Sequence, residues 1–355
     1  MGFGNRMKNI RLLSALTALT LLVSGCNVVL PSETVSSSKE TVQETSAVTE
    51  TETSQTETTK PAEPIKFNPH VHTSLVSDLV TEDMWNSFYN MCDAIRAGED
   101  TFECSSEDAY KWCTGEVTFG MMFPAACTKV VGDGYSNGIA KLKYLMDKDK
   151  FLERQKEFEA EIERILNEAI RSDYSDLEKT LGLYDYMSRN WVYDTRDVNE
   201  TLDDFGNYAC LMNKNGICVE ISYAYLYLLL QVGVEAMLYE TSCDHMWNYV
   251  VIGGKGYHID TTWALHGNIP TANTTLKYFM MTEQNRIDDG LNKDVFEATM
   301  IEFWKADYDL AKFSATDETF QFFREALFLG IDTEKNVIRY SDILCNEQEF
   351  YYGDL

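Results

Sequence analysis

Three stretches of the chain carry apolar residues at helical spacing. Between residues 148 and 170 an apolar stripe lies opposite a surface of Glu, Lys and Arg, which predicts a long amphipathic helix. Ser175 and Glu178 have the spacing of a capping box that opens the next helix, which continues to about residue 190. The third stretch, residues 218–232, is apolar on nearly every face, which is typical of a helix enclosed by the rest of a domain.

The clearest strand signal lies around two adjacent glycines. Gly253-Gly254 is a two-residue turn of the kind that β-hairpins prefer. Closing this hairpin places Trp247 opposite Asp260, and it makes His245 a diagonal neighbour of Asp260 on the same face. The sequence therefore predicts that an imidazole and a carboxylate come within hydrogen-bonding reach.

The remaining elements are less regular. Residues 75–97 and 107–112 have helical character, and residues 115–135 carry Gly and Pro breaks that suit strands or loops. Residues 291–330 are expected to be mostly helical, and residues 337–340 are expected to form a terminal strand.

The first 25 residues read as an export signal. Three basic residues precede an apolar run, 12–23, that is too short to span a bilayer as a stable helix. The run ends in Val23-Ser24-Gly25-Cys26, which resembles the lipobox of bacterial lipoproteins. The resemblance implies cleavage before Cys26, lipidation of this cysteine and an extracytoplasmic position at the cell membrane. An ordinary signal peptide is the alternative.

A tether and three further regions follow the predicted leader. Residues 26–65 consist of the cysteine and a segment rich in Ser, Thr and Glu, which cannot bury enough apolar surface to fold. A flexible coil of this length reaches about 35 Å on average. We assign residues 66–170 to a mostly helical N-terminal region, residues 171–290 to the core that carries the candidate chemistry, and residues 291–355 to a C-terminal extension of helices and a strand.

The charge of the chain limits the classes of partner that we expect it to bind. The sequence has 30 Lys and Arg residues against 57 Asp and Glu residues, a formal net charge of −27. This balance argues against nucleic acid as a partner, because the phosphates would be repelled. Solubility explains the acidity more simply than any specific role does.

The chain has nine cysteines. Apart from Cys26 and Cys218, they are Cys92, Cys104, Cys113, Cys127, Cys210, Cys243 and Cys345. Seven cannot all pair within the chain, and their irregular spacing does not indicate a disulfide scaffold. The spacing does not suggest a zinc site either, and we expect neither a metal nor another cofactor.

Cys218 is the candidate nucleophile. It lies in the first turn of the enclosed helix, after turn residues in which Asn215 is the candidate N-cap. A helix dipole contributes about 0.3 to 1 kcal/mol, or about 2 kcal/mol in a partly buried site, which is too little to make a strong nucleophile at neutral pH. A neighbouring imidazolium is needed for a larger effect. Without such a partner, a buried and inert cysteine is the better interpretation.

His245 is the preferred partner of Cys218. It would hold the proton of the thiol and return it to the leaving group, while Asp260 would orient the imidazole. Two other histidines compete for the role. His258 would lie opposite Tyr249, nearer to the hairpin turn, and His266 would lie in the loop after the strand.

These pieces resemble the transglutaminase-like superfamily, whose fold is related to that of papain-type cysteine peptidases. The resemblance covers about residues 176–285, in the order nucleophile, imidazole, carboxylate. The matching segments are Trp191-Val192-Tyr193-Asp194, Gly216-Ile217-Cys218-Val219-Glu220, Ser222, His245-Met246-Trp247-Asn248, Tyr257-His258-Ile259-Asp260-Thr261-Thr262-Trp263 and Tyr278-Phe279-Met280-Met281-Thr282. Many members carry an aromatic residue where this chain has Ile221, a difference that concerns packing.

The resemblance implies a papain-like α+β core, with the nucleophile at the N-terminus of a central helix that packs on an antiparallel sheet. It also implies a cell-surface enzyme that acts on amide bonds of proteins or peptides through a thioester at Cys218. Hydrolysis, as in a peptidase, is the first expectation, because water surrounds a tethered domain. Cross-linking of glutamine to lysine side chains is one alternative, and an inactive binding or scaffold module is another.

An oxyanion hole needs donors that point to the place where charge develops. The backbone N–H of Cys218 is the first candidate. The side chain of Trp191 is the second, although a place in the core suits Trp191 as well. Trp247 is expected to form a wall of the site.

Overall fold

The computed structural model describes residues 62–195, 206–241, 245–267, 272–290 and 310–355. The residues from Glu63 onward form one compact unit. The expected leader, the Cys26 lipidation site, the tether as far as residue 61 and the first half of the expected helical stretch 291–330 lie outside the described residues.

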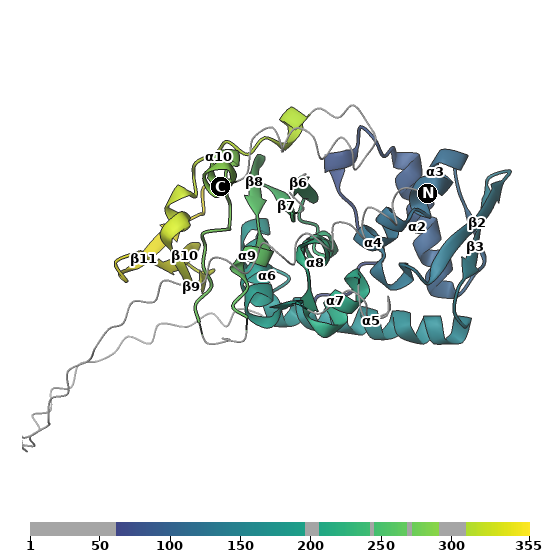
Figure 1. Ribbon diagram of the computed structural model, residues 1–355, viewed down its shortest axis with the longest axis horizontal. Helices are drawn as coiled ribbons and strands as arrows, with labels where there is room; N and C mark the ends of the chain where they lie inside the picture. The colour runs from purple at the N-terminus through teal and green to yellow at the C-terminus, as the bar shows by residue number, and fades with distance from the viewer. Residues whose placement is uncertain (1–61, 196–205, 242–244, 268–271, 291–309) are drawn as a thin grey trace, which may run out of the picture. The chain divides into compact units, whose positions relative to one another are not determined.

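The N-terminal part combines helices with a small sheet (Figure 1). Its helices are α2 (Glu82–Ala97), α3 (Glu107–Cys113), α4 (Glu116–Met122) and α5 (Lys148–Ala169), with the short 3-10 helices η1 (Ser74–Val76) and η2 (Pro124–Ala126). Strands β1 (Thr101–Glu103), β2 (Val130–Ser136) and β3 (Ile139–Tyr144) form an antiparallel sheet in the order β1-β3-β2. Residues 115–135, predicted as strands or loops, thus also contain helix α4. Burial of its residues from Thr118 to Met122 outweighs the weak local propensity.

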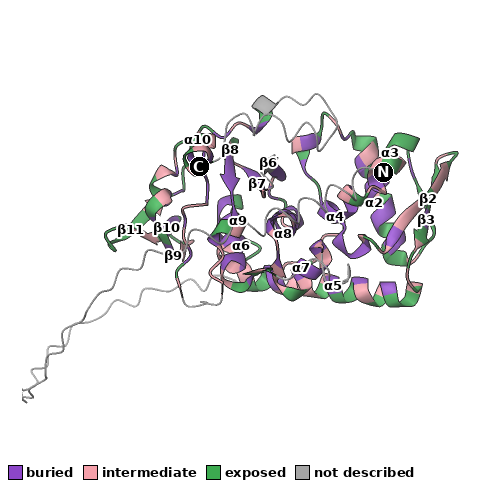
Figure 2. Cartoon of the chain, in the orientation of Figure 1, coloured by how far each residue is buried: buried purple, intermediate pink, exposed green. Residues whose placement is uncertain are grey.

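The predicted amphipathic pattern of α5 is confirmed. Phe151, Phe158 and Ile162 are buried, and Figure 2 shows that much of the remaining helix surface is exposed. The next helix, α6 (Asp176–Asn190), begins at the predicted capping box. The Glu178 carboxylate accepts the backbone N–H of Ser175 at 2.6 Å, and the Ser175 hydroxyl accepts the N–H of Glu178 at 3.4 Å.

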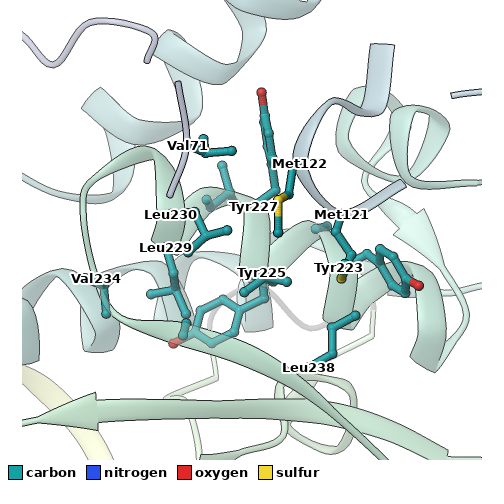
Figure 3. Packing of buried hydrophobic residues seen from close by; sticks show 14 of the residues in the cluster. Val71, Met121, Met122, Tyr223, Tyr225, Tyr227, Leu229, Leu230, Val234 and Leu238 are labelled. Carbon is teal, nitrogen blue, oxygen red and sulfur yellow. The ribbon is translucent and has the colours of Figure 1, made fainter. Parts of the chain in front are cut away.

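Helix α8 (Cys218–Gln231) is the enclosed helix that the sequence predicts. Every residue of α8 except Val219 is buried. It packs against α4, α6, α7 (Asn207–Asn213), α9 (Thr261–Ala264) and the strands that follow it. Figure 3 shows its apolar side chains among Val71, Met121, Met122 and Leu238. Burial on all sides leaves α8 little freedom to shift, which suits a helix that carries a reactive group.

The sheet beside α8 contains β6 (Ala236–Thr241), β7 (His245–Ile252) and β8 (Lys255–Ile259) in the antiparallel order β6-β7-β8. Gly253 and Gly254 both have positive φ, as the predicted two-residue turn requires, and Ile252 pairs with Lys255. The predicted register of the hairpin is therefore confirmed.

Both faces of this sheet are covered. Asn248 of β7 donates its side-chain N–H to the carbonyl of Ser222 in α8 at 2.9 Å. From the opposite face of β7, the Tyr249 hydroxyl donates to the carbonyl of Ser314 at 3.2 Å. The sheet is thus a central layer between α8 and the C-terminal part of the chain.

The prediction that residues 291–330 are mostly helical is wrong for the residues described, 310–330. They form two 3-10 helices, η4 (Leu310–Phe313) and η5 (Gln321–Glu325), before strand β9 (Leu327–Asp332) begins. The apolar residues are aromatic side chains that stack on one another, such as Phe320 on Phe323 at 5.6 Å between ring centroids, rather than a stripe along an α-helix.

The predicted strand over 337–340 is confirmed as β10 (Val337–Ser341), although it is not terminal, because β11 (Glu347–Tyr351) follows. These strands form an antiparallel sheet in the order β11-β10-β9. Among the described residues, none of the helices combines the length and the apolar character needed to cross a bilayer. The combination of helices with separate, mainly antiparallel sheets confirms the α+β class.

Candidate active site

Cys218 is the first residue of α8, and 4% of its surface is exposed. The turn before it is held by the parallel pairing of β4 (Val192–Tyr193) with β5 (Asn215–Gly216). The Glu220 carboxylate accepts the backbone N–H of Ile217 at 3.0 Å and that of Gly206 at 2.7 Å. These bonds fix the backbone that carries the thiol.

The expectation that Asn215 caps this helix is wrong. Asn215 lies in β5, and the N-cap position is occupied by Ile217, whose N–H is bound by Glu220 from inside the helix. Gly216 allows this tight arrangement. A Cβ atom at Gly216 would lie 3.0 Å from the Cys210 sulfur and 3.0 Å from the Cβ of Glu220, so a larger residue would displace the turn.

His245 is the first residue of β7, and its side chain is 13% exposed. Its Nε2 lies 2.7 Å from Oδ2 of Asp260, the contact that the hairpin register predicts. Burial opposes a charge on the imidazole, but the carboxylate of Asp260 and a hydrogen bond with Cys218 outweigh this and raise the pKa of His245 to about 9. At neutral pH the ring is therefore an imidazolium between a carboxylate and a sulfur.

Asp260 is fully buried and caps α9. Its Oδ1 accepts the backbone N–H of Trp263 at 3.1 Å, and its own backbone N–H donates to the carbonyl of Tyr278 at 2.9 Å. Burial favours the neutral acid, but His245 and Arg286 outweigh it and hold the pKa of Asp260 below its usual value. Asp260 is therefore ionised, and hydrogen bonds hold both its side chain and its backbone.

Two hydrogen bonds link the helix of Cys218 to the strand of His245. The Ser222 hydroxyl, one turn beyond Cys218, donates to the carbonyl of Met246 at 2.8 Å. Asn248 donates to the carbonyl of Ser222 at 2.9 Å. Because these bonds join neighbours of both reactive residues, they set how far the sulfur lies from the imidazole.

Two tryptophans flank the imidazole. Trp247 is fully buried, and its ring stacks on His245 with 5.8 Å between centroids. Trp263 is 38% exposed and stacks on the same imidazole at 5.1 Å. Trp247 therefore backs the imidazole from inside the protein, and Trp263 is the tryptophan that solvent and a substrate can reach.

The expected role of Trp191 is not met in this structure. Its side chain is fully buried, and its indole N–H is already donated to the carbonyl of Cys210 at 3.1 Å. Instead, the hydroxyl of Tyr193 accepts a hydrogen bond from the backbone N–H of Cys218. Burial is the main cause that raises the pKa of Tyr193 to about 12, so the phenol is neutral and can donate its own proton. Sequence reasoning missed Tyr193, although it lies in the segment that carried the resemblance.

The two rival histidines lie elsewhere. His258 is fully buried opposite Tyr249, as predicted, and its Nδ1 accepts the indole N–H of Trp247 at 3.1 Å. Burial and the charge of Arg286 lower the pKa of His258 to about 3, which keeps the ring neutral. His266 follows α9 in a loop, where its backbone N–H donates to the carbonyl of Ser188 at 2.9 Å. His245 is thus the histidine that the fold brings to Asp260 and Cys218.

Sequence reasoning also missed Arg286. This side chain is 0% exposed, and its Nη1 lies 3.0 Å from Oδ2 of Asp260. Its only sequence signal is its place shortly after the segment Tyr278-Phe279-Met280-Met281-Thr282, and the tertiary fold alone brings it to the carboxylate.

A surface cavity of about 420 Å³ lies in the N-terminal part of the protein, where His72, Trp85 and Tyr89 contribute to its lining. Its lining residues do not include Cys218, His245 or Asp260, so the cavity is separate from the candidate active site.

No protein-family model and no curated protein matches this chain. Among solved structures, a TGase is similar over 40% of this chain and 47% of its own length, with 16% identity and a TM-score of 0.27. A proposed cysteine protease from Cytophaga hutchinsonii is similar over 38% of this chain and 61% of its own length, with 11% identity and a TM-score of 0.24. This chain thus spans about half of the first solved chain and about three fifths of the second.

Proposed function

We propose that this protein is a transglutaminase-like cysteine enzyme that acts on amide bonds of proteins or peptides through a thioester at Cys218. The observation that carries the proposal is the position of His245, which meets Asp260 at 2.7 Å and also interacts with the Cys218 thiol. A thiol, an imidazole and an orienting carboxylate are the parts of a nucleophilic acyl-transfer site.

In the proposed reaction the Cys218 thiolate attacks the carbonyl carbon of the amide, and a tetrahedral oxyanion forms. The C–N bond then breaks as His245 gives its proton to the departing amine, which leaves a thioester and a neutral imidazole. A water molecule gives a proton to His245 and attacks the thioester carbonyl. The C–S bond breaks, the carboxylic acid leaves, and the thiolate–imidazolium pair is restored.

The tetrahedral oxyanion needs two donors, and the residues around Cys218 offer them. The backbone N–H of Cys218 points to the Tyr193 hydroxyl. An oxyanion that displaced the Tyr193 hydroxyl from this N–H would accept the N–H from one side and the phenol O–H from the other. Tyr193 therefore replaces Trp191 as the proposed second donor.

Hydrolysis is the proposed outcome, because the acceptor available to a domain in bulk water is water itself. The test is incubation with glutamine-containing peptides and a labelled primary amine. Ammonia or peptide release without labelled product supports hydrolysis, whereas labelled product at a comparable rate assigns the protein to amine transfer.

The control for this test is a pair of cysteine variants. Cys218→Ala should abolish turnover and keep the thermal unfolding transition, whereas Cys345→Ala, at an exposed cysteine between β10 and β11, should leave both unchanged. Normal turnover by Cys218→Ala would remove the assignment. Absence of turnover on all substrates, together with an unreactive Cys218, would favour a binding or scaffold module.

We further propose that Cys26 anchors the protein to the outer side of the cell membrane through lipid, with the segment that follows as a tether. The support is the sequence Val23-Ser24-Gly25-Cys26 at the end of an apolar run. Cells given radiolabelled palmitate should label the wild-type protein and not the Cys26→Ala variant. Equal labelling of both would exclude this anchor.

A further inference from the structure

Arg286 is the least expected charged residue near the candidate active site. It belongs to the short helix α10 (Glu283–Asp288), which begins at a capping box formed by Thr282 and Asn285. Its side chain is 0% exposed and is among the largest fully buried side chains of the described residues. Arginine is almost never fully buried unless it is paired, so its partners indicate why it is there.

The guanidinium of Arg286 lies against two indole rings. Its carbon atom is 4.2 Å from the ring centroid of Trp247 and 4.6 Å from that of Trp263. The flat, weakly hydrated guanidinium is suited to such stacking, which an ammonium would not reproduce. Because both tryptophans also stack on His245, the cation and the imidazole share the same aromatic walls.

Within the part of the chain that the structure describes, Arg286 forms an ion pair with one carboxylate, that of Asp260. Nη1 lies 3.0 Å from Oδ2 of Asp260, and a weak contact of 4.0 Å joins Nη1 to the sulfur of Met281. Within those residues, Nε and Nη2 have no hydrogen-bond partner.

Asp260 shares one oxygen between two cationic groups. Oδ2 lies 2.7 Å from Nε2 of His245 and 3.0 Å from Nη1 of Arg286, while Oδ1 accepts the N–H of Trp263. When His245 is an imidazolium beside the thiolate, the positive charges of His245 and Arg286 balance the negative charges of Asp260 and Cys218. When His245 has given its proton to the leaving group, Asp260 still has the guanidinium as its counter-ion.

We propose that Arg286 is a positioning residue of this site, and that its guanidinium keeps the buried Asp260 carboxylate paired and oriented while His245 releases its proton. The inference rests on the proposed function of Cys218 and His245. Without Arg286, release of the proton would leave a bare carboxylate in the interior, so His245 would hold its proton more tightly. The leaving group would then be protonated more slowly.

The groups that titrate around this pair come from several elements. They are Cys218 of α8, His258 of β8, Tyr184 of α6, Tyr193 of β4, Tyr278 before α10 and Asp289 after it. His258 stays neutral and the phenols of Tyr184 and Tyr193 have raised pKa values, so the charges of His245, Asp260 and Arg286 decide the outcome, together with that of Asp289, which interacts with Arg286.

The first test is a titration of the histidines by NMR, with the protein labelled with ¹³C at the imidazole carbons. The chain has five histidines, and a His245→Gln variant assigns the signal of His245. The wild-type signal should titrate near pH 9. In Arg286→Met, which keeps a long side chain between the indoles without the charge, it should titrate about one unit higher. In Arg286→Lys, which keeps the charge, it should stay within about 0.3 units of the wild type.

The matched control is Arg324→Met. Arg324 is a partly buried arginine that pairs with Asp289 at 2.8 Å, beyond the end of α10, and it does not contact Asp260. This variant loses an arginine–aspartate pair from the same region and should leave the His245 titration unchanged. A shift equal to that of Arg286→Met would mean that any loss of packing near α10 moves His245, and it would overturn the proposal.

The second test is turnover on the amide substrate. Arg286→Met should lower kcat about 10- to 100-fold with KM nearly unchanged, and Arg286→Lys should recover part of the loss. Wild-type kcat in a folded Arg286→Met protein, or a His245 titration that does not move or moves downward, overturns the proposal. If Arg286→Met gives no cooperative unfolding transition, the Lys variant decides, and a shift of its His245 titration by a full unit overturns the proposal.

The two tests also separate this inference from the proposed function. The NMR titration needs no substrate. A protein that shows no turnover on any amide, yet follows the expected His245 shifts, refutes the proposed reaction and keeps the role of Arg286 toward Asp260. A protein that turns over the amide substrate, and in which the Arg286 variants leave the His245 titration unchanged, supports the proposed reaction and refutes the role of Arg286 toward Asp260.

Discussion

Asp260 combines a structural and a chemical role in one side chain. Oδ1 caps α9, and Oδ2 lies against His245 and Arg286. An N-cap is worth about 1 kcal/mol, so the structural role alone does not require a carboxylate, since an asparagine caps as well. The chemical role uses the charge, because a carboxylate stabilises the imidazolium of His245 more than a neutral amide does.

Asp260→Asn should lower the stability of the fold, because it leaves the buried Arg286 without its counter-ion, and it should change the pH dependence of the proposed reaction. In the proposed reaction the imidazolium is the active form, and it is lost as pH rises through the pKa of His245, about 9 in the wild type. Without the carboxylate, burial should lower this pKa to its ordinary value of about 6.5 or below, which moves the alkaline limb of kcat/KM down by at least about two units. A profile from pH 5 to pH 10 checks this. An unmoved limb would mean that another group sets the pKa of His245.

Tyr193 gives a second prediction at this scale. Tyr193→Phe keeps the ring and removes the hydroxyl that lies at the Cys218 N–H. If the hydroxyl stabilises the oxyanion, kcat should fall about 100-fold while KM changes little. Steady-state kinetics on one amide substrate measures both. A faster Phe variant would mean that the phenol blocks the oxyanion position in the resting enzyme instead of serving it.

Among the secondary-structure elements, α8 and β7 carry Cys218 and His245, and their contact sets the geometry between these two residues. The hydrogen bonds of Ser222 and Asn248 cross this contact, beside Cys218 on one element and His245 on the other. A nucleophile and its base must be held within a few tenths of an ångström to react well, and a small shift of one element past the other is costly.

Ser222→Ala should lower both stability and kcat. The buried carbonyl of Met246 would lose its donor, which costs about 1 to 3 kcal/mol of unfolding free energy, and α8 could shift relative to β7. Ser87→Ala is the control, because Ser87 is also buried and bonded to a backbone carbonyl, that of Asp83 in α2. Denaturant unfolding and kinetics of both variants separate the effects. Equal kcat in the two variants would mean that the cross-link serves stability alone.

The features that could be predicted from sequence are those fixed by local chemistry. The capping box at Ser175, the all-apolar pattern of α8 and the two-glycine turn each act within a few residues. The turn also sets the hairpin register and thereby the meeting of His245 with Asp260. Cys218 followed from its place at the start of an enclosed helix.

The features that could not be predicted depend on contacts between distant segments. Arg286 reaches Asp260 because the segment that leads into α10 bonds to β8 through Met281 and His258, and an isolated arginine in a polar segment carries no sign of burial. Trp191 and Tyr193 are two residues apart, and which one faces Cys218 depends on the pairing of β4 with β5. The aromatic residues near Phe320 follow tertiary stacking rather than helical periodicity.

At the scale of the whole molecule, the site couples the stability of the fold to pH. The pKa of His245 is raised from its ordinary value of about 6.5 to about 9 by folding, so protonated His245 favours the folded state. The gain is fully present below about pH 6.5 and is lost as pH rises through about 9. At 1.36 kcal/mol per unit it is on the order of 3 kcal/mol.

Denaturant unfolding between pH 6 and pH 10 should show this loss as a difference between proteins. The wild type should lose on the order of 3 kcal/mol more than His245→Gln across this window, because the variant has no imidazole to titrate. Groups that titrate there and do not contact His245, such as the other buried thiols, contribute to both proteins and cancel in the difference, which therefore measures His245 together with its partner Cys218. Parallel curves would show that His245 does not carry a raised pKa in the folded protein.

The most direct measurement of the central claim, that His245 and Asp260 activate the sulfur of Cys218, is the rate at which iodoacetamide alkylates each cysteine at pH 6.5, followed by peptide mass spectrometry. Cys345 is the internal reference, because it is an exposed cysteine of the same chain. The account predicts that Cys218 reacts at least about tenfold faster than Cys345, and that His245→Gln removes this advantage. A folded protein in which Cys218 reacts more slowly than Cys345, with no change in the His245→Gln variant, would contradict it.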